Sequence, residues 1–267
     1  MTTQTVPQTT TAPTTPFARA YLALTRAEVR RVLRNRTYLV PTLILPLMFF
    51  GLFGLPNLQG RLSGVGAGPY MVISYAAYAL ISTAMFSFGV SVAAERSSGW
   101  LRQLRLTPMS PAAYFAAKIS ASIVLGLLSI TLLSVFARIT GGVSIPAAQL
   151  IAAYAKLLIG MVPFALLGLA IGLSFGGGSA APVANLINLP LMFASGIFYP
   201  LDVAPQFIRT LAPYLPAYHY GQLGWSSIGA HVTGAEWTHW AWLGGYGLVF
   251  LALAMLAYRR DEARRGA

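Results

Sequence analysis

The chain has no cysteine and very little charge. The absence of cysteine excludes disulfides, thiolate catalysis and cysteine-ligated zinc. Only 9% of the residues are charged and 56% are hydrophobic, whereas a soluble domain averages roughly 25% charged residues. Acidic residues are the scarcest charges, with 6 Asp and Glu against 18 Lys and Arg. So few polar groups cannot cover a water-exposed surface, so we expect lipid to surround most of the chain.

Motifs for ATP hydrolysis and metal binding are also missing. No phosphate-binding loop of the form G-x-x-x-x-G-K-[ST] is present, so the chain is not expected to hydrolyse ATP or to carry a cofactor itself. His231, Glu236 and His239 are candidate metal ligands. A helical carboxylate site of this kind needs a second Glu-x-x-His copy, which the sequence lacks, so we expect no metal there and interpret the segment as a polar loop.

Long uncharged runs are what the sequence has in abundance. A helix of about 20 apolar residues crosses the roughly 30 Å of bilayer hydrocarbon. One run, Leu157–Leu201, is long enough for two crossings and is divided by the glycines before Pro182. The runs predict an all-α polytopic membrane protein with six transmembrane helices, at about 38–58, 70–93, 117–137, 150–173, 182–199 and 240–258.

The basic residues predict the orientation. Six lie in the N-terminal segment, four between residues 95 and 118, and four in the C-terminal tail, of 18 in all. Lys and Arg are enriched on the cytoplasmic side of membrane proteins, so both termini and the 95–118 segment are predicted to be cytoplasmic. The sequence offers no folded domain with a basic face, so we expect no nucleic-acid partner.

The N-terminal 36 residues divide into two parts. Residues 1–16 are rich in Thr, Gln and Pro without a charge and are predicted to be a disordered tail. Residues 17–36 are predicted to form an amphipathic helix in the membrane interface, in contact with lipid headgroups. Its polar face carries Arg19, Arg26, Arg30 and Arg34, and its apolar face carries Phe17, Ala20, Tyr21, Leu24 and Ala27. The alternative is a basic flank with no further role.

A polar hairpin from Glu95 to Lys118 separates the second and third apolar runs. It is too short to fold alone, so we expect it to meet a soluble partner at the membrane surface. Leu101 and Leu104 share one face of a short helix there. Their burial against a partner protein is the favoured interpretation, and packing on the 17–24 helix or dipping into the interface are the alternatives.

Three further patterns lie in the second half of the chain. Gly168, Gly172 and Gly176 recur every four residues and predict a close approach of neighbouring helices. Asn185 and Asn188 are expected to share a helix face, either hydrogen-bonded to another helix or lining a substrate path. The prolines and aromatic residues of the 205–228 segment predict short re-entrant or interfacial helices at the external leaflet.

Together these features resemble the ABC-2 type permeases, the membrane subunits of prokaryotic exporters that include the daunorubicin-resistance type. The resemblance rests on the basic helix, the six spans, the hairpin Glu95-Arg96…Gly99…Leu101…Leu104…Thr107-Pro108…Lys118, and the end of the fifth span, Asn188-Leu-Pro190-Leu…Ser195-Gly196-Ile-Phe198-Tyr-Pro200. It runs from about Phe17 to the C-terminus and makes residues 37–267 one transmembrane domain. Trp100-Leu101-Arg102-Gln103 departs from the family, whose members often carry a threonine and an acidic residue after the glycine.

The resemblance implies a non-enzymatic transport subunit in the cytoplasmic membrane of a prokaryote. Glu95, Gly99, Leu101, Leu104, Thr107 and Pro108 would couple it to a separate ATP-binding subunit, which holds ATP and Mg. Two such subunits and a second, identical permease copy are implied partners. The path between the copies would be lined by the second and fifth spans, including Asn185, Asn188, Phe193 and Phe198. The scarcity of charge favours an amphipathic or lipid-like cargo, and an intramembrane enzyme or a channel without an ATPase are the alternatives.

Overall fold

The computed structural model describes residues 17–100 and 111–266, and most of these residues are helical. The helices are α1 (Phe17–Arg34), α2 (Arg36–Phe49), α3 (Ala67–Ser97), α5 (Pro111–Gly141), α6 (Ala147–Gly160), α7 (Val162–Ser174), α8 (Gly177–Ala194), α9 (Gln206–Leu211), α10 (Pro216–Ser226) and α11 (Glu236–Gly266). A small antiparallel hairpin of β1 (Arg61–Leu62) and β2 (Val65–Gly66) pairs Arg61 with Gly66 and Leu62 with Val65.

Among the described residues, five helical stretches are long and apolar enough to cross a membrane, which agrees with the prediction of an all-α polytopic membrane protein. They are Leu39–Asn57, Ala67–Ser97, Ala113–Gly141, Ala147–Ser174 and Glu236–Arg260. The apolar stretch Gly178–Ala194 in α8 is shorter than the about 20 residues that a full crossing requires. The sixth crossing therefore stays a prediction.

Two predicted spans are less regular than the sequence indicates. The span predicted at 150–173 consists of α6 and α7, interrupted at Met161 just before Pro163, whose ring carries no N–H to continue a helix. After α2 the helix changes to π geometry over Phe50–Gly54 and then to a 3₁₀ turn over Leu55–Asn57.

The predicted break before the fifth span lies at Phe175-Gly176, whereas Pro182 lies inside α8.

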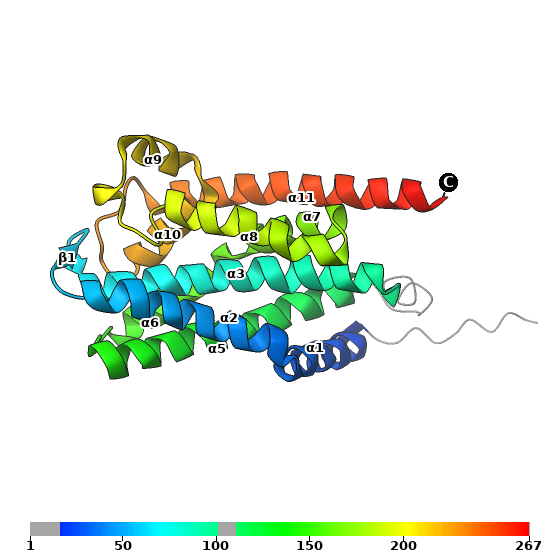
Figure 1. Ribbon diagram of the computed structural model, residues 1–267, viewed down its shortest axis with the longest axis horizontal. Helices are drawn as coiled ribbons and strands as arrows, with labels where there is room; N and C mark the ends of the chain where they lie inside the picture. Colours follow the sequence, from blue (N-terminus) through cyan, green and yellow to red (C-terminus); the bar gives the residue numbers. More distant parts are fainter. Residues whose placement is uncertain (1–16, 101–110, 267) are drawn as a thin grey trace, which may run out of the picture.

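α3 forms the centre of the bundle, with α2, α5, α7 and α8 packed around it (Figure 1). It is buried on nearly all sides, whereas little of α2 and α11 is buried. α3 and α7 approach closely at glycines, as the sequence predicts for Gly168 and Gly172. A Cβ atom on Gly89 would lie only 2.7 Å from the carbonyl oxygen of Gly168. Gly176, the third member of the pattern, has open space around it.

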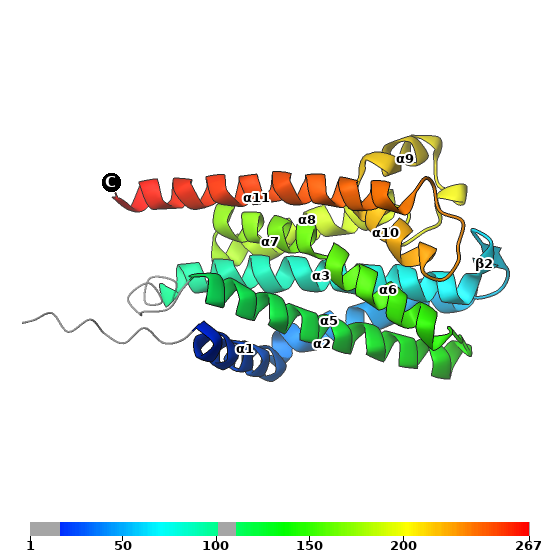
Figure 2. The ribbon, with the colours of Figure 1, turned by 180° about the vertical axis from the view of Figure 1, so that it is seen from behind.

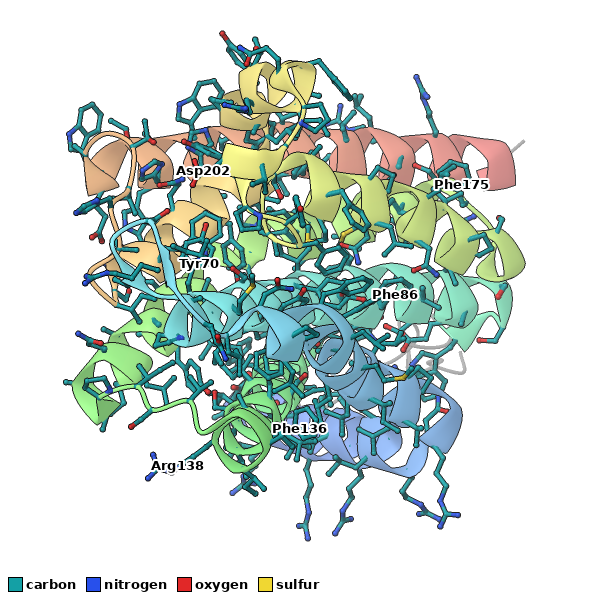
Figure 3. The ribbon with its side chains drawn as sticks, turned by 60° about the vertical axis from the view of Figure 1, so that its left-hand side comes forward. Tyr70, Phe86, Phe136, Arg138, Phe175 and Asp202 are labelled. Carbon is teal, nitrogen blue, oxygen red and sulfur yellow. The ribbon has the colours of Figure 1, made fainter. Side chains whose placement is uncertain are left out.

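Different elements lie at the two ends of the bundle. One end holds α1, the end of α3, the start of α5 and the C-terminal end of α11 (Figures 1 and 2). The other end holds the β-hairpin, α9 and α10 (Figures 1 and 2). In Figure 3 the labelled Phe175 lies near the first end, and Tyr70 and Asp202 lie near the second. The 205–228 segment forms the predicted short helices, and its position at the external leaflet stays a prediction.

Candidate functional site

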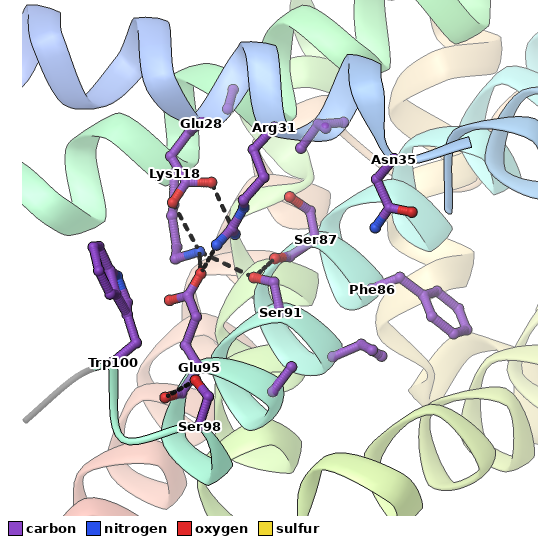
Figure 4. A pocket seen from close by; sticks show the side chains of 14 residues that line it. Glu28, Arg31, Asn35, Phe86, Ser87, Ser91, Glu95, Ser98, Trp100 and Lys118 are labelled. Atoms are coloured by element: carbon purple, nitrogen blue, oxygen red, sulfur yellow. Dashed lines mark hydrogen bonds and ion pairs between the residues drawn. The ribbon is translucent and has the colours of Figure 1, made fainter. Parts of the chain in front are cut away.

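Four charged side chains meet at the end of the bundle where α1 lies against α5. Glu28 and Arg31 come from α1, Glu95 from the last turns of α3, and Lys118 from α5 (Figure 4). We call these four residues the ion-pair cluster. They line a cavity of about 560 Å³ between the three helices.

Glu95 is the centre of the cluster. Its carboxylate accepts hydrogen bonds from Lys118 Nζ at 2.8 Å, from a guanidinium nitrogen of Arg31 and from the Tyr114 hydroxyl. Glu28 lies 2.9 Å from Arg31 and 3.4 Å from Lys118. Two carboxylates and two cations balance one another, so the cluster carries no net charge.

The cluster differs from an ordinary surface ion pair because its central pair is buried. The Lys118 side chain is 2% exposed and that of Glu95 is 6% exposed, whereas Arg31 is 45% exposed. Burying one such charge alone costs several kcal/mol, and a close partner with further hydrogen bonds offsets that cost. Lys118 also donates a hydrogen bond to the Ser91 hydroxyl at 3.1 Å. Ser122 donates to the Ser87 hydroxyl at 2.8 Å, one turn along α5.

The carboxylates also affect Arg31, which lies on α1 outside the membrane-spanning helices. Burial alone lowers the pKa of Arg31, but the neighbouring carboxylates of Glu95 and Glu28 outweigh it and raise that pKa above its ordinary value. Arg31 therefore keeps its charge, and α1 stays electrostatically attached to the end of α3.

The ion-pair cluster closes the base of the predicted hairpin. Glu95 and Lys118 are the two ends of that segment, and their 2.8 Å contact holds the end of α3 against the start of α5. At Gly99 the backbone has a φ of +76°, a conformation that favours glycine. Leu101, Leu104, Thr107 and Pro108, the other predicted coupling residues, lie outside the described residues.

Sequence reasoning selected Glu95 for its place in the hairpin and missed its partners on α1. Periodicity did not identify Glu28, because it lies on the face of α1 that packs against the bundle. One signal was available: Glu28 and Glu95 are two of only six acidic residues in the chain. An acid in such a cation-rich membrane protein is a natural ion-pair candidate.

The predicted interfacial arginines lie on the opposite face of α1. Arg19, Arg26, Arg30 and Arg34 are all exposed. The predicted apolar face is only partly buried, since Phe17 is 54% exposed while Tyr21 hydrogen-bonds to the Ser120 hydroxyl on α5 at 2.7 Å. α1 therefore packs on α5 through a partly polar face, and its contact with lipid headgroups stays a prediction.

The predicted path residues on α8 and just after its end lie in different surroundings. Asn188 is buried and donates a hydrogen bond to Ser82 on α3 at 2.9 Å, while its carbonyl oxygen has no partner among the described residues. Asn185 is exposed. Phe193 is also exposed, and Phe198 is buried in ring contacts with several aromatic residues, among them Phe49, Tyr75 and Tyr78. Asn188 thus bridges two helices, and a shared environment for the two asparagines is not observed.

The candidate metal ligands at the other end have separate partners. Glu236 pairs with Lys156 at 2.7 Å, and Lys156 also donates to the Ser226 hydroxyl. The Nδ1 atoms of His239 and His219 lie 2.9 Å apart. His231 packs against Gly64 in the β-hairpin turn. In the part of the chain that the structure describes, no three acidic or histidine side chains converge on a possible metal position.

Comparison with known proteins agrees with this architecture. Residues 19–226 match the family described as ABC-2 type transporter. The chain is also similar to the "Putative transport permease YvfS" of Bacillus subtilis (strain 168), with 28% identity over 239 residues. That match covers 89% of this chain and 96% of the relative. Because the family match extends over most of the sequence and includes the ion-pair cluster, the chain belongs to the ABC-2 type transporter family as a permease subunit.

Proposed function

We propose that this chain is the permease subunit of an ATP-driven exporter, and that residues 95–118 dock on a separate ABC ATP-binding subunit. The observation that carries the proposal is the ion-pair cluster. It joins both ends of the proposed docking hairpin to each other and to α1. Force applied to the hairpin would therefore reach three helices at once.

The contacts of α3 support a mechanical role. Its end is held by the cluster on one side and by a hydrogen bond from Arg96 to the carbonyl oxygen of Leu173 on the other. Further along, glycine contacts bring α3 against α7. Closure of an ATPase dimer would push the hairpin and move α3 with its neighbours as a rigid body, a common form of switching between two states.

The proposed assembly has two copies of this permease and two ATP-binding subunits, which hold the ATP and Mg. The exposed apolar side chains of α8, such as Leu186, Leu189 and Phe193, favour a path between the two copies. A path with few fixed charges suits an amphipathic or lipid-like cargo, moved out across the cytoplasmic membrane of a prokaryote. Asn188 would then support the wall of this path from behind by holding α8 to α3.

The proposed orientation places the ion-pair cluster and both termini in the cytoplasm. The chain has no native cysteine, so single introduced thiols can report the side on which they lie. Ser98→Cys should resist an impermeant thiol reagent in intact cells, and Val203→Cys should react. The opposite labelling pattern would contradict the orientation.

Docking of the hairpin is tested by purifying the tagged permease from its native host and identifying co-purifying ATPases by mass spectrometry. Burying a leucine contributes about 1.5–3 kcal/mol. Leu104→Asp should therefore leave the chain in the membrane but abolish co-purification of an ATP-binding-cassette ATPase. Val203→Asp adds the same charge at the other end of the bundle and should retain the ATPase. A Leu104→Asp variant with bound ATPase and wild-type transport would refute the docking role.

A further inference from the structure

A second cavity lies at the same end of the bundle as the ion-pair cluster but on the opposite side of α3. It is a groove of about 360 Å³ between α3, α7 and α11. Arg96 at the end of α3 and Arg260 near the end of α11 form its charged rim. Leu167, Leu253, Leu256 and Phe175 are among its apolar lining residues. Neither arginine belongs to the ion-pair cluster.

The groove extends from the charged end of the bundle into the apolar part of the helices. Leu167 precedes Ser174 by seven residues on α7, and Leu253 precedes Arg260 by seven residues on α11. At about 1.5 Å per residue, each wall is roughly 10 Å long. A polar ligand from the water phase can contact the rim, and an acyl chain can in addition lie along these apolar walls.

The groove is open on the side that faces away from the bundle. Leu253 is 47% exposed and Leu256 is 51% exposed. Both lie on the span Glu236–Arg260, most of which is exposed. A molecule in the surrounding bilayer can therefore enter sideways, without passing between packed helices.

The charge of the rim selects the headgroup. Arg96 and Arg260 are both cationic, and no acidic side chain is among the lining residues that the structure describes. Guanidinium groups bind phosphate oxygens through paired hydrogen bonds. Basic pockets between transmembrane helices commonly bind anionic lipid headgroups.

We propose that this groove binds one anionic phospholipid from the leaflet on the hairpin side. The phosphate lies between Arg96 and Arg260, and an acyl chain lies along Leu167, Leu253 and Leu256. Because Arg96 also bonds the Leu173 carbonyl, the lipid would brace the junction of α3, α7 and α11. This inference does not depend on the ATPase partner, the cargo or the direction of transport.

The test measures lipid binding to the purified full-length chain by native mass spectrometry. Dioleoylphosphatidylglycerol and dioleoylphosphatidylcholine have the same acyl chains and differ in net charge. The wild-type chain should retain one phosphatidylglycerol molecule preferentially. Arg260→Gln and Arg96→Gln should each weaken that binding at least about tenfold, which corresponds to the ~1.5 kcal/mol of one hydrogen bond to a charged group.

The matched control is Arg259→Gln, which removes an exposed arginine next to Arg260 that does not line the groove. It should leave binding unchanged. Arg96→Gln also removes the hydrogen bond to the Leu173 carbonyl and could loosen the end of α7. Arg260→Gln tests the groove without this effect, because no hydrogen bond from Arg260 to α7 is observed among the described residues.

Four results would overturn the proposal. The first is equal retention of phosphatidylglycerol and phosphatidylcholine, and the second is a loss of phosphatidylglycerol binding in Arg259→Gln as large as that in Arg260→Gln. The third is complete displacement of the bound lipid by soluble glycerol phosphate. The fourth is an Arg260→Gln variant that keeps phosphatidylglycerol but loses a bound ATPase. The third result would mean that the walls hold no acyl chain, and the fourth would assign the rim to a protein partner.

Discussion

Replacing Glu95 by glutamine tests the ion-pair cluster directly, because it removes one charge and keeps the shape of the side chain. Lys118 would lose its 2.8 Å carboxylate partner and keep the more distant Glu28, at 3.4 Å, and its hydrogen bond to the Ser91 hydroxyl. A buried ammonium left without its main partner typically costs 3–5 kcal/mol. We expect Glu95→Gln to lower the free energy of unfolding by about that amount.

The other single changes should be milder. Arg31 is 45% exposed, so Arg31→Gln should cost about 1 kcal/mol or less, as for a solvent-screened pair. Lys118→Met should cost less than Glu95→Gln, because Glu95 still has Arg31 and the Tyr114 hydroxyl as donors. The double variant Glu95→Gln with Lys118→Met leaves neither partner buried alone and should be more stable than Glu95→Gln itself.

The assay is reversible unfolding of the purified chain in mixed micelles of increasing SDS. The wild type, Glu95→Gln, Lys118→Met and the double variant form a double-mutant cycle for Glu95 and Lys118. The coupling energy between the two residues should be at least about 2 kcal/mol, near the upper end of that for residues in direct contact. It should persist at 1 M salt, where exposed charges are screened over about 3 Å. A coupling energy below about 0.5 kcal/mol, or a double variant less stable than either single one, would refute the reasoning.

Three further predictions concern other parts of the fold. Asn188→Leu should lower stability by about 1 kcal/mol through loss of its intramembrane hydrogen bond, while unchanged transport across several cargoes would exclude a path role. Gly168→Leu should lower the melting temperature sharply because its side chain would overlap the α3 backbone, whereas Gly176→Leu, in open space, should not. Burial, together with the nearby His239, lowers the pKa of His219 to about 4, below the ordinary 6.5, so protonation favours unfolding. Stability should therefore be constant above about pH 6.5 and fall toward pH 4, and a His219→Gln variant with the same pH profile would contradict this assignment.

Much of the architecture could be predicted from where charges are absent. The long uncharged runs indicate the crossings, and the glycines at 168 and 172 indicate where two helices touch. Helix boundaries and breaks could be predicted less well. The interruption at Met161 lies inside a continuous apolar run, and hydropathy does not distinguish one straight helix from two joined ones.

The orientation of each helix about its own axis could not be predicted. α3 and α5 are apolar on every side, so no periodicity indicates which face meets which neighbour. Asn185 and Asn188 illustrate the problem: they are close in angle on α8, yet only Asn188 is turned toward α3. The ion-pair cluster could not be predicted for the same reason, because the facing sides of its helices were unknown. Its members come from three helices, and Lys118 is 90 positions from Glu28 in the sequence.

The buried position of α3 has a consequence for biosynthesis. α3 has the lowest mean hydropathy of the five candidate spans, 1.6, and carries Glu95 near its end. When Glu95 at the end of α3 emerges from the ribosome, Lys118, which follows 23 residues later, has not yet emerged. Arg31 is the cluster cation that has already emerged at that moment. Arg31 on α1 can therefore neutralise the carboxylate of Glu95 while α3 enters the membrane, until Lys118 on α5 arrives. The N-terminal helix would thus assist the insertion of the candidate span with the lowest mean hydropathy.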